Sequence, residues 1–147
     1  MPINKFKADS VAARDGVWKE YSANSDGTVP AIKIARNSRH NVRYTKAMRE
    51  LVTMPDGTID ASVFTGMNDE ETTKAEIDLY CETIITDWRN IQPNDGGVED
   101  EIPFSIDNAK ALLKDPDWLD LFDDIRAFAA EVSHYRAKEL EESAKNL

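Results

Sequence analysis

Carboxylates are the most abundant groups in this 147-residue chain that could do chemistry. Glycoside hydrolysis, for example, needs two carboxyls that face each other across a cleft, with the pKa of one raised by apolar surroundings. The acidic residues here fall on the polar faces of predicted amphipathic helices or in a glycine-containing loop. We therefore expect a solvated surface and no enzymatic activity. The main acidic groups are Asp69-Glu70-Glu71, Glu99-Asp100-Glu101, Asp115, Asp117, Asp120 and Asp123-Asp124.

Residues 94–101 are rich in oxygen-bearing side chains, so they are a candidate calcium-binding loop. An EF-hand loop needs oxygen ligands at positions 1, 3 and 5, glycine at position 6 and glutamate at position 12. Placing Gly96 at position 6 puts Ile91 at position 1, and placing Gly97 there puts Gln92 at position 1, so both alignments fail. The two histidines and the single cysteine give no zinc-ligand spacing. Apart from an adventitious site in this loop, no metal and no cofactor is expected.

Nucleophilic and phosphate-loop chemistry are not expected either. Cys81 lies in a predicted apolar stripe beside Asp78 and Glu82, whereas a reactive thiolate needs an electropositive setting. His134 has no histidine four residues away and is interpreted as a surface or boundary residue. Asp95-Gly96-Gly97 lacks both the GxGxxG spacing and the GK[ST] ending of phosphate-binding loops. The sequence therefore predicts no catalytic residue.

The most basic stretch, residues 36–43, is a candidate binding surface. Arg36, Arg39 and Arg43 carry its charge, and a helix capped by Ser38 would add its N-terminus to a phosphate-contacting face. The stretch matches no nucleic-acid motif, and the rest of the chain is acidic. Three interpretations stay open: pairing with the protein's own acids, contact with the acidic surface of a protein partner, and nucleic acid, which the acidic remainder disfavours.

Charge is divided unevenly along the chain, whose formal net charge is -10. Residues 1–50 hold ten Lys/Arg against five Asp/Glu, residues 51–100 hold two against twelve, and residues 101–147 hold six against eleven. This division favours internal pairing or an acidic surface that meets a basic partner. The start of the chain is too polar for a signal peptide, and no apolar run approaches the ~20 residues that span a bilayer. A cytosolic protein without membrane contact is expected.

The N-terminal third is predicted to contain a β-hairpin and a helix. Apolar and polar residues alternate at 16–21 and 29–35 around a loop rich in Ser, Asn, Asp and Gly, which indicates the hairpin. Ser38 is predicted to cap a helix over 39–52, which a Pro-Asp-Gly turn at 55–57 ends. The inward-facing residues of this helix would be Val42, Ala47 and Leu51.

Residues 58–67 are compatible with a short helix or an extended step through Ile59, Val63 and Phe64. Asn68 or Asp69 would then cap a long helix whose acidic first turn suits the helix dipole. One apolar stripe on a 3.6-residue period predicts that this helix runs as far as Trp88. The stripe consists of Ile77, Tyr80, Cys81, Ile84, Ile85 and Trp88.

The C-terminal third is predicted to be a loop followed by two helices. The loop covers 92–100, and Ser105 caps a helix to about Lys114 that groups Ile106, Ala109, Leu112 and Leu113. Asp115-Pro116 breaks that helix and opens the last one. The apolar face of the last helix is Trp118, Leu121, Phe122, Ile125, Phe128, Ala129, Val132 and Tyr135, after which the pattern thins into a fraying helical end.

The whole pattern predicts an α+β fold in which an N-terminal β-hairpin precedes a mainly helical body of four to five helices. One domain over 1–147 is expected, with the hairpin part at 1–36, the helical body at 38–143 and a flexible tail at 144–147. Trp18, Trp88 and Trp118 are interpreted first as core residues. The alternative is a partner-facing role for Trp88 or Trp118, together with Phe104 of the apolar step 102–104.

The order of elements between Trp88 and Ile125 resembles the tail assembly chaperones of long-tailed bacteriophages. A helix that ends in tryptophan is followed by an acidic, glycine-bearing loop, an apolar step, a Ser-capped helix, a Lys-Asp-Pro break and a final amphipathic helix. The resemblance rests on apolar and loop residues and covers roughly the second half of the chain. The matching residues are Trp88, Gly96, Ile102 to Ser105, Asn108, Leu112 to Asp115, Leu119, Ile125 and the closing Ala144-Lys145-Asn146.

This resemblance implies a binding function without catalysis. Proteins of that family coat the tape measure protein, keep it soluble, recruit tail tube subunits and leave before the tail is complete. The expected partners are therefore the tape measure protein and the tail tube protein, in the cytoplasm of the host bacterium and not in the mature virion. Self-association and a longer form made by ribosomal frameshifting stay open. The alternatives are a structural tail or head-tail connector protein of the virion, or a small nucleic-acid-binding regulator.

Overall fold

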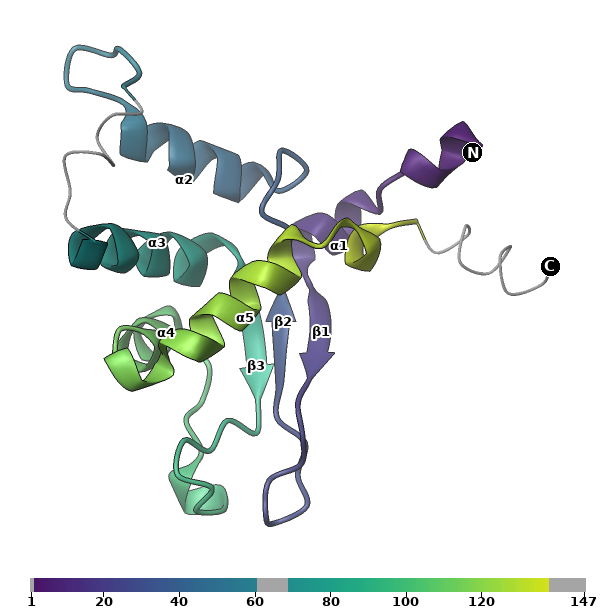
Figure 1. The fold of residues 1–147 in the computed structure, drawn as a ribbon, viewed down its shortest axis with the longest axis vertical. Coiled ribbons are helices and arrows are strands. Elements are labelled where there is room, and N and C mark those ends of the chain that lie inside the picture. The colour runs from purple at the N-terminus through teal and green to yellow at the C-terminus, as the bar shows by residue number, and fades with distance from the viewer. Residues whose placement is uncertain (1, 61–68, 138–147) are drawn as a thin grey trace.

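A three-stranded antiparallel sheet in the order β1-β2-β3 forms the centre of the computed structural model, which describes residues 2–60 and 69–137 (Figure 1). The predicted hairpin is confirmed: β1 (Val17–Glu20) pairs with β2 (Ala31–Ile34) so that Val17 lies opposite Ile34. A third strand, β3 (Ile85–Arg89), pairs with the other edge of β2. The predicted α+β class is therefore confirmed, with one strand more than expected.

The third strand corrects the predicted long helix. Helix α3 spans Asp69–Thr83, and the chain then turns into β3, so the prediction that the helix reaches Trp88 is wrong. The pairing of β2 with β3 shifts register between Lys33 and Ile34, which leaves Thr86 as an extra residue in β3. This bulge turns Ile85 and Trp88 to the same buried face, although they are three residues apart. A bulged strand thus reproduces the spacing of a helical stripe.

Five α-helices surround the sheet in the described part of the chain. Two follow local signals that the sequence predicted, since Ser105 caps α4 through a 2.9 Å bond from the Asn108 amide and Asp115 precedes the Pro116 break. Helix α1 was not predicted, and its cap is Asp9. The helices are α1 (Ser10–Asp15), α2 (Val42–Val52), α3, α4 (Ile106–Leu113) and α5 (Leu119–Ala130), and the 3-10 helices are η1 (Ile3–Phe6), η3 (Val98–Asp100), η4 (Pro116–Trp118) and η5 (Val132–Tyr135).

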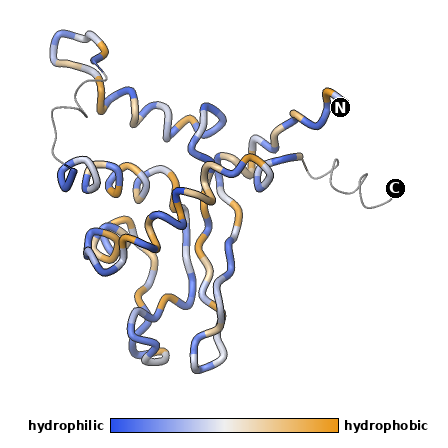
Figure 2. The backbone as a smooth tube through the Cα atoms, viewed as in Figure 1, coloured by the Kyte–Doolittle hydropathy of each residue, from blue (hydrophilic) through white to orange (hydrophobic). Residues whose placement is uncertain are grey.

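Helices α3, α4 and α5 pack with the sheet into one apolar core, while α2 lies outside it against α3 (Figure 1). Apolar residues are concentrated on the strands and in short stretches of the helices (Figure 2). Most of the predicted stripe of α3 is buried there, and so are Ile85 and Trp88 of β3. Two predicted inward residues are wrong, because Val42 is 66% exposed and Ile106 is 44% exposed. The largest fully buried apolar side chains are Ile32, Ile34, Ile77, Cys81, Ile84, Leu113, Phe122, Ile125 and Tyr135.

The last helix is shorter than predicted. Helix α5 ends at Ala130, and Tyr135 is buried from the following 3-10 helix, where its hydroxyl donates to the Ile34 carbonyl at 2.9 Å. Arg136 then pairs with Ala8 in an isolated bridge. The predictions for Val63, Phe64 and the Asn68 cap, for the helical end beyond 137 and for the tail at 144–147 lie outside the described residues. None of the described helices combines the length and apolarity needed to cross a membrane.

Candidate partner-binding site

Helix α2 is attached to the body along one side only. None of its residues is fully buried, and its packing partner is α3. Tyr44 contacts Tyr80 edge-on with ring centroids 6.3 Å apart, which is the aromatic part of that contact. Burial raises the pKa of Tyr44, so its hydroxyl stays neutral at physiological pH. A helix held this way leaves apolar surface uncovered beside it.

A groove of about 350 Å³ lies along the junction of α2 and α3, and we call it the α2–α3 groove. Its apolar lining comes from Ala47 and Leu51 of α2 and from Ala75 and Leu79 of α3. Ala47 and Ala75 have short side chains, so they leave the groove between the two helices open. The sequence predicted Ala47 and Leu51 as inward residues, and both are half-buried.

Acidic side chains form the rim of the α2–α3 groove. Glu50, Asp78 and Glu82 line it beside the apolar floor. Lys110 of α4 and Lys114, the C-cap of that helix, pair with the rim: Lys114 Nζ lies 2.6 Å from Asp78 Oδ1 and Lys110 Nζ lies 2.6 Å from Glu82 Oε1. The hydrogen bond to Glu82 raises the pKa of Lys110. Glu50 makes no ion pair within residues 2–60 and 69–137 and adds uncompensated negative charge.

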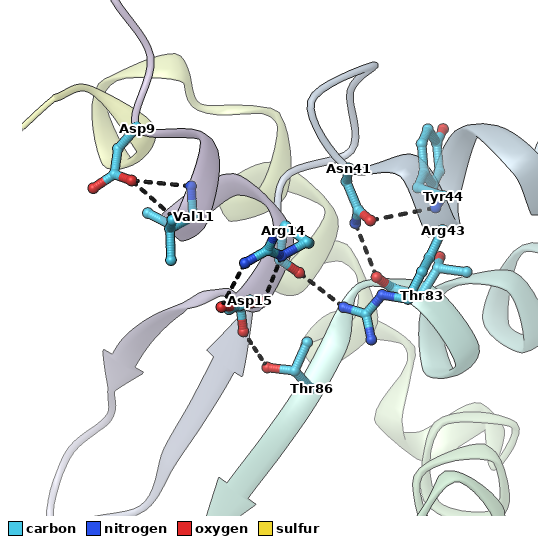
Figure 3. A network of polar contacts seen from close by, with 10 residues as sticks. Asp9, Val11, Arg14, Asp15, Asn41, Arg43, Tyr44, Thr83 and Thr86 are labelled. Atoms are coloured by element: carbon cyan, nitrogen blue, oxygen red, sulfur yellow. Dashed lines mark hydrogen bonds and ion pairs between the residues drawn. The ribbon is translucent and has the colours of Figure 1, made fainter.

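The start of α2 is fixed by polar contacts rather than by apolar burial (Figure 3). Asn41 is fully buried, donates through Nδ2 to the Thr83 carbonyl at 2.9 Å and accepts the Tyr44 amide at 3.3 Å. The predicted cap Ser38 is therefore wrong, and Asn41 is the N-cap. Arg43 Nη2 donates to the Arg14 carbonyl at 2.8 Å and ties α2 to the end of α1. These contacts position the groove.

The basic candidates predicted from the sequence lie where β2 leads into α2. Arg36 and Arg39 are in the connection, and Arg43 is in the first turn of α2. Arg43 is committed to α1 through its bond to the Arg14 carbonyl. The Arg14 guanidinium lies 2.9 Å from Asp15 Oδ1, and this hydrogen bond lowers the pKa of Asp15. Arg36 is half-buried and Arg39 is exposed, and neither has an ion-pair partner in the described part of the chain. None of these arginines lines the α2–α3 groove.

The aromatic candidates divide between core and surface. Trp88 is buried, its indole N–H donates to the Ile102 carbonyl at 2.8 Å, and Phe104 stacks on it edge-on with centroids 5.5 Å apart. These two side chains fasten the 102–104 segment to β3. Trp118 is half-buried and lines a second cavity instead. Phe104 and Trp118 are therefore both partly exposed, and of the three only Trp118 lines that cavity.

We call this second cavity the Trp118 groove; its volume is about 180 Å³. It is lined mainly by Tyr21, Pro30, Ile32, Ile91, Trp118 and Leu121. Burial first, and then the hydrogen bond to Asp124, raises the pKa of Tyr21, whose hydroxyl lies 2.9 Å from Asp124 Oδ2. Lys19 Nζ lies 2.5 Å from the same oxygen, and these two bonds outweigh burial and lower the pKa of Asp124.

Neither a metal site nor a reactive thiol is indicated among the residues that the structure describes. No three His, Cys, Asp or Glu side chains of residues 2–60 and 69–137 lie where they could hold one ion. Cys81 is buried, and burial followed by the charge of Asp78 raises its pKa to about 12. The thiol is thus neutral and enclosed. Both grooves are instead lined mainly by apolar side chains, and the α2–α3 groove also has acidic side chains at its rim.

Sequence reasoning missed half of each groove. Ala75, Leu79 and Glu82 recur every three to four residues on α3 and form a second, weaker stripe beside the predicted one. That signal was present and could have been found. Tyr21 and Ile91 meet Trp118 only through the tertiary fold, so no local pattern could have placed them together.

A family model described as YdaY prophage protein matches residues 35–146, a stretch that includes both helices of the α2–α3 groove and also Trp118. No curated protein and no solved structure matches the chain.

Proposed function

The chain belongs to the YdaY prophage protein family and is phage-derived, and from that premise we propose that it is a tail assembly chaperone, without catalytic activity, for the tape measure protein. The observation that carries the proposal is the α2–α3 groove, an open apolar channel between two helices with an acidic rim. Helix-in-groove binding is a common way for a protein to hold an amphipathic helix.

The chemistry of the groove specifies the bound segment. A floor of alanine and leucine receives an apolar stripe, and Glu50, the rim acid without an ion pair in the described residues, favours lysine or arginine beside that stripe. A tape measure protein is a very long helix, and its stripes would aggregate if they stayed exposed before assembly. A covering protein with a net charge of -10 would keep such a complex soluble.

The remaining features of the proposal follow from the same resemblance to tail assembly chaperones. The chain would act in the cytoplasm of the host bacterium, deliver the tape measure protein to tail tube subunits and be absent from the mature virion. Mass spectrometry of purified virions tests this part. Detection of the chain at structural stoichiometry would favour a tail or connector protein instead.

The groove itself is tested by co-expression with the tape measure protein of the same phage. We expect wild-type chain to keep that protein in the soluble fraction and to co-purify with it. Ala47→Arg fills the groove with a charged side chain and should lower the recovered complex about tenfold or more. Val42→Arg adds the same charge to the same helix at a position that is 66% exposed and outside the groove, and it should bind like wild type.

Glu50→Lys provides a second groove variant that leaves the apolar floor intact. Thermal melts of all three variants check that each one folds, which we expect because α2 contains no buried residue. Tape measure protein that is equally soluble without the chain would contradict the chaperone function. Equal binding by the Ala47→Arg and Val42→Arg variants would contradict the assignment of the groove.

A further inference from the structure

The N-terminal arm, residues 2–7, extends beyond the body of the molecule (Figure 1). Ile3 is 86% exposed and Phe6 is 62% exposed, and η1 contains no buried residue. Lys5 and Lys7 alternate with them, so the arm is both apolar and basic (Figure 2). Such exposure costs solubility unless a partner covers the arm.

The base of the arm is fixed, so its direction is set. The Ala137 amide donates to the Lys7 carbonyl at 3.1 Å, and the Asp9 amide donates to the Tyr135 carbonyl at 2.8 Å. The arm leaves from the α1 end of the sheet (Figure 1). The Trp118 groove lies at the other end, beside Pro30 and the turn between β1 and β2. The arm therefore points away from the groove of its own molecule.

The Trp118 groove has the chemistry that the arm requires. Its lining is mostly apolar and aromatic, and its volume of about 180 Å³ suits one or two apolar side chains better than a whole helix. Asp26 contacts the groove residue Gln92 at 2.9 Å, and Asp117 and Asp120 flank Trp118 and Leu121 in the chain. None of these three acids forms an ion pair within the part of the chain that the structure describes.

We propose that the arm of one copy docks in the Trp118 groove of the next copy. Ile3 and Phe6 enter the groove, and Lys5 and Lys7 lie against the surrounding aspartates. Because the donating and accepting surfaces are different and lie at opposite ends of the sheet, the contact is head-to-tail and does not close on itself in a dimer. The chain thereby forms linear arrays, which leave the α2–α3 groove of every copy free.

Self-association is measured by sedimentation velocity across a concentration series, without any tape measure protein. We expect wild type to form species larger than a dimer, increasingly so at low salt because charge pairs contribute. The double variant Ile3→Ser/Phe6→Ser lacks the apolar anchors, and Asp117→Lys/Asp120→Lys reverses the charge near the groove. Each should lower the association constant about tenfold or more, because a few central side chains dominate such contacts.

Mixing the two variants gives the sharpest result. The arm variant still has an intact groove and the groove variant still has an intact arm, so the mixture should form one-to-one dimers and nothing larger. All four positions are exposed, so folding is expected to be unchanged, and thermal melts check it.

Wild type that stays monomeric, or variants that associate as wild type does, would overturn the proposal. A mixture that forms no dimer would also overturn it, because the intact arm of one variant should still bind the intact groove of the other. Binding of a tape measure segment to the Trp118 groove, lost in the Asp117→Lys/Asp120→Lys variant, would assign the groove to another occupant. The chaperone proposal is independent of these outcomes, because it rests on the α2–α3 groove.

Discussion

Asn41 is the residue on which the attachment of α2 depends most. Its side chain accepts the Tyr44 amide as the helix cap and donates to the Thr83 carbonyl at the end of α3. Ser38 and Asn41 are both good capping residues, and the local sequence does not separate them. The choice is made by the Thr83 carbonyl, 42 residues away along the chain, which no local pattern reveals. The Ser105 cap was predictable because everything it needs lies within three residues.

Substitution of Asn41 tests this assignment. Asn41→Ala removes a cap worth about 1 kcal/mol and a buried hydrogen bond worth about 1 kcal/mol, so the free energy of unfolding should fall by about 2 kcal/mol. Ser38→Ala is the matched control and should change it by less than about 0.5 kcal/mol, because Ser38 accepts only an exposed amide at 3.2 Å. Urea denaturation measures both. A larger loss for the Ser38 variant would restore the predicted cap.

Some elements are indicated by residues within their own segment, whereas others form only by pairing with a distant strand. The hairpin, the 55–57 turn and the Asp115-Pro116 break were predicted because each has its own turn or breaker residues. Strand β3 was not predicted. Its bulge at Thr86 places Ile85 and Trp88 on one face although they are three residues apart, which is the spacing of a helix. The β-branched run Ile84-Ile85-Thr86 was the signal against a helix, since such residues favour strands.

Gly16 joins α1 to β1 where the sheet is most crowded, and it provides the test at this scale. Its φ of 103° and ψ of 163° suit glycine almost alone. A Cβ there would lie 3.1 Å from the Ile34 carbonyl carbon and 3.0 Å from Thr86 Oγ1. Gly16→Ala should therefore cost about 2 kcal/mol or more of unfolding free energy.

Gly27→Ala is the control for the backbone conformation alone. Gly27 also has a positive φ, of 87°, but no atom lies within 4 Å of a Cβ built there. Its cost should be about 1 kcal/mol, the price of the left-handed conformation without a clash. Equal losses for the two variants in urea denaturation would show that β3 does not approach Gly16 closely.

At the scale of the whole molecule, part of the uneven charge is paired within the fold, and part of the apolar surface lies in two separate grooves. The basic segment 1–50 identified from composition is partly used internally, since Lys19 pairs with Asp124 and the Arg43 guanidinium donates to the Arg14 carbonyl of α1. Composition could indicate an acidic binding surface but not its position, because the α2–α3 groove exists only where two helices meet. The first interpretation of Trp88 as a core residue is confirmed, although the strand that buries it was not predicted, and Trp118 is only partly buried.

The most direct test of the central claim is hydrogen–deuterium exchange of the chain with and without its tape measure protein. In the free protein the amides of Val42–Val52 should exchange quickly, because no residue of α2 is buried. On binding, exchange should slow in α2 and in the facing turns of α3, and Ala47→Arg should abolish the change. Protection confined to other elements, or no protection at all, would contradict the account.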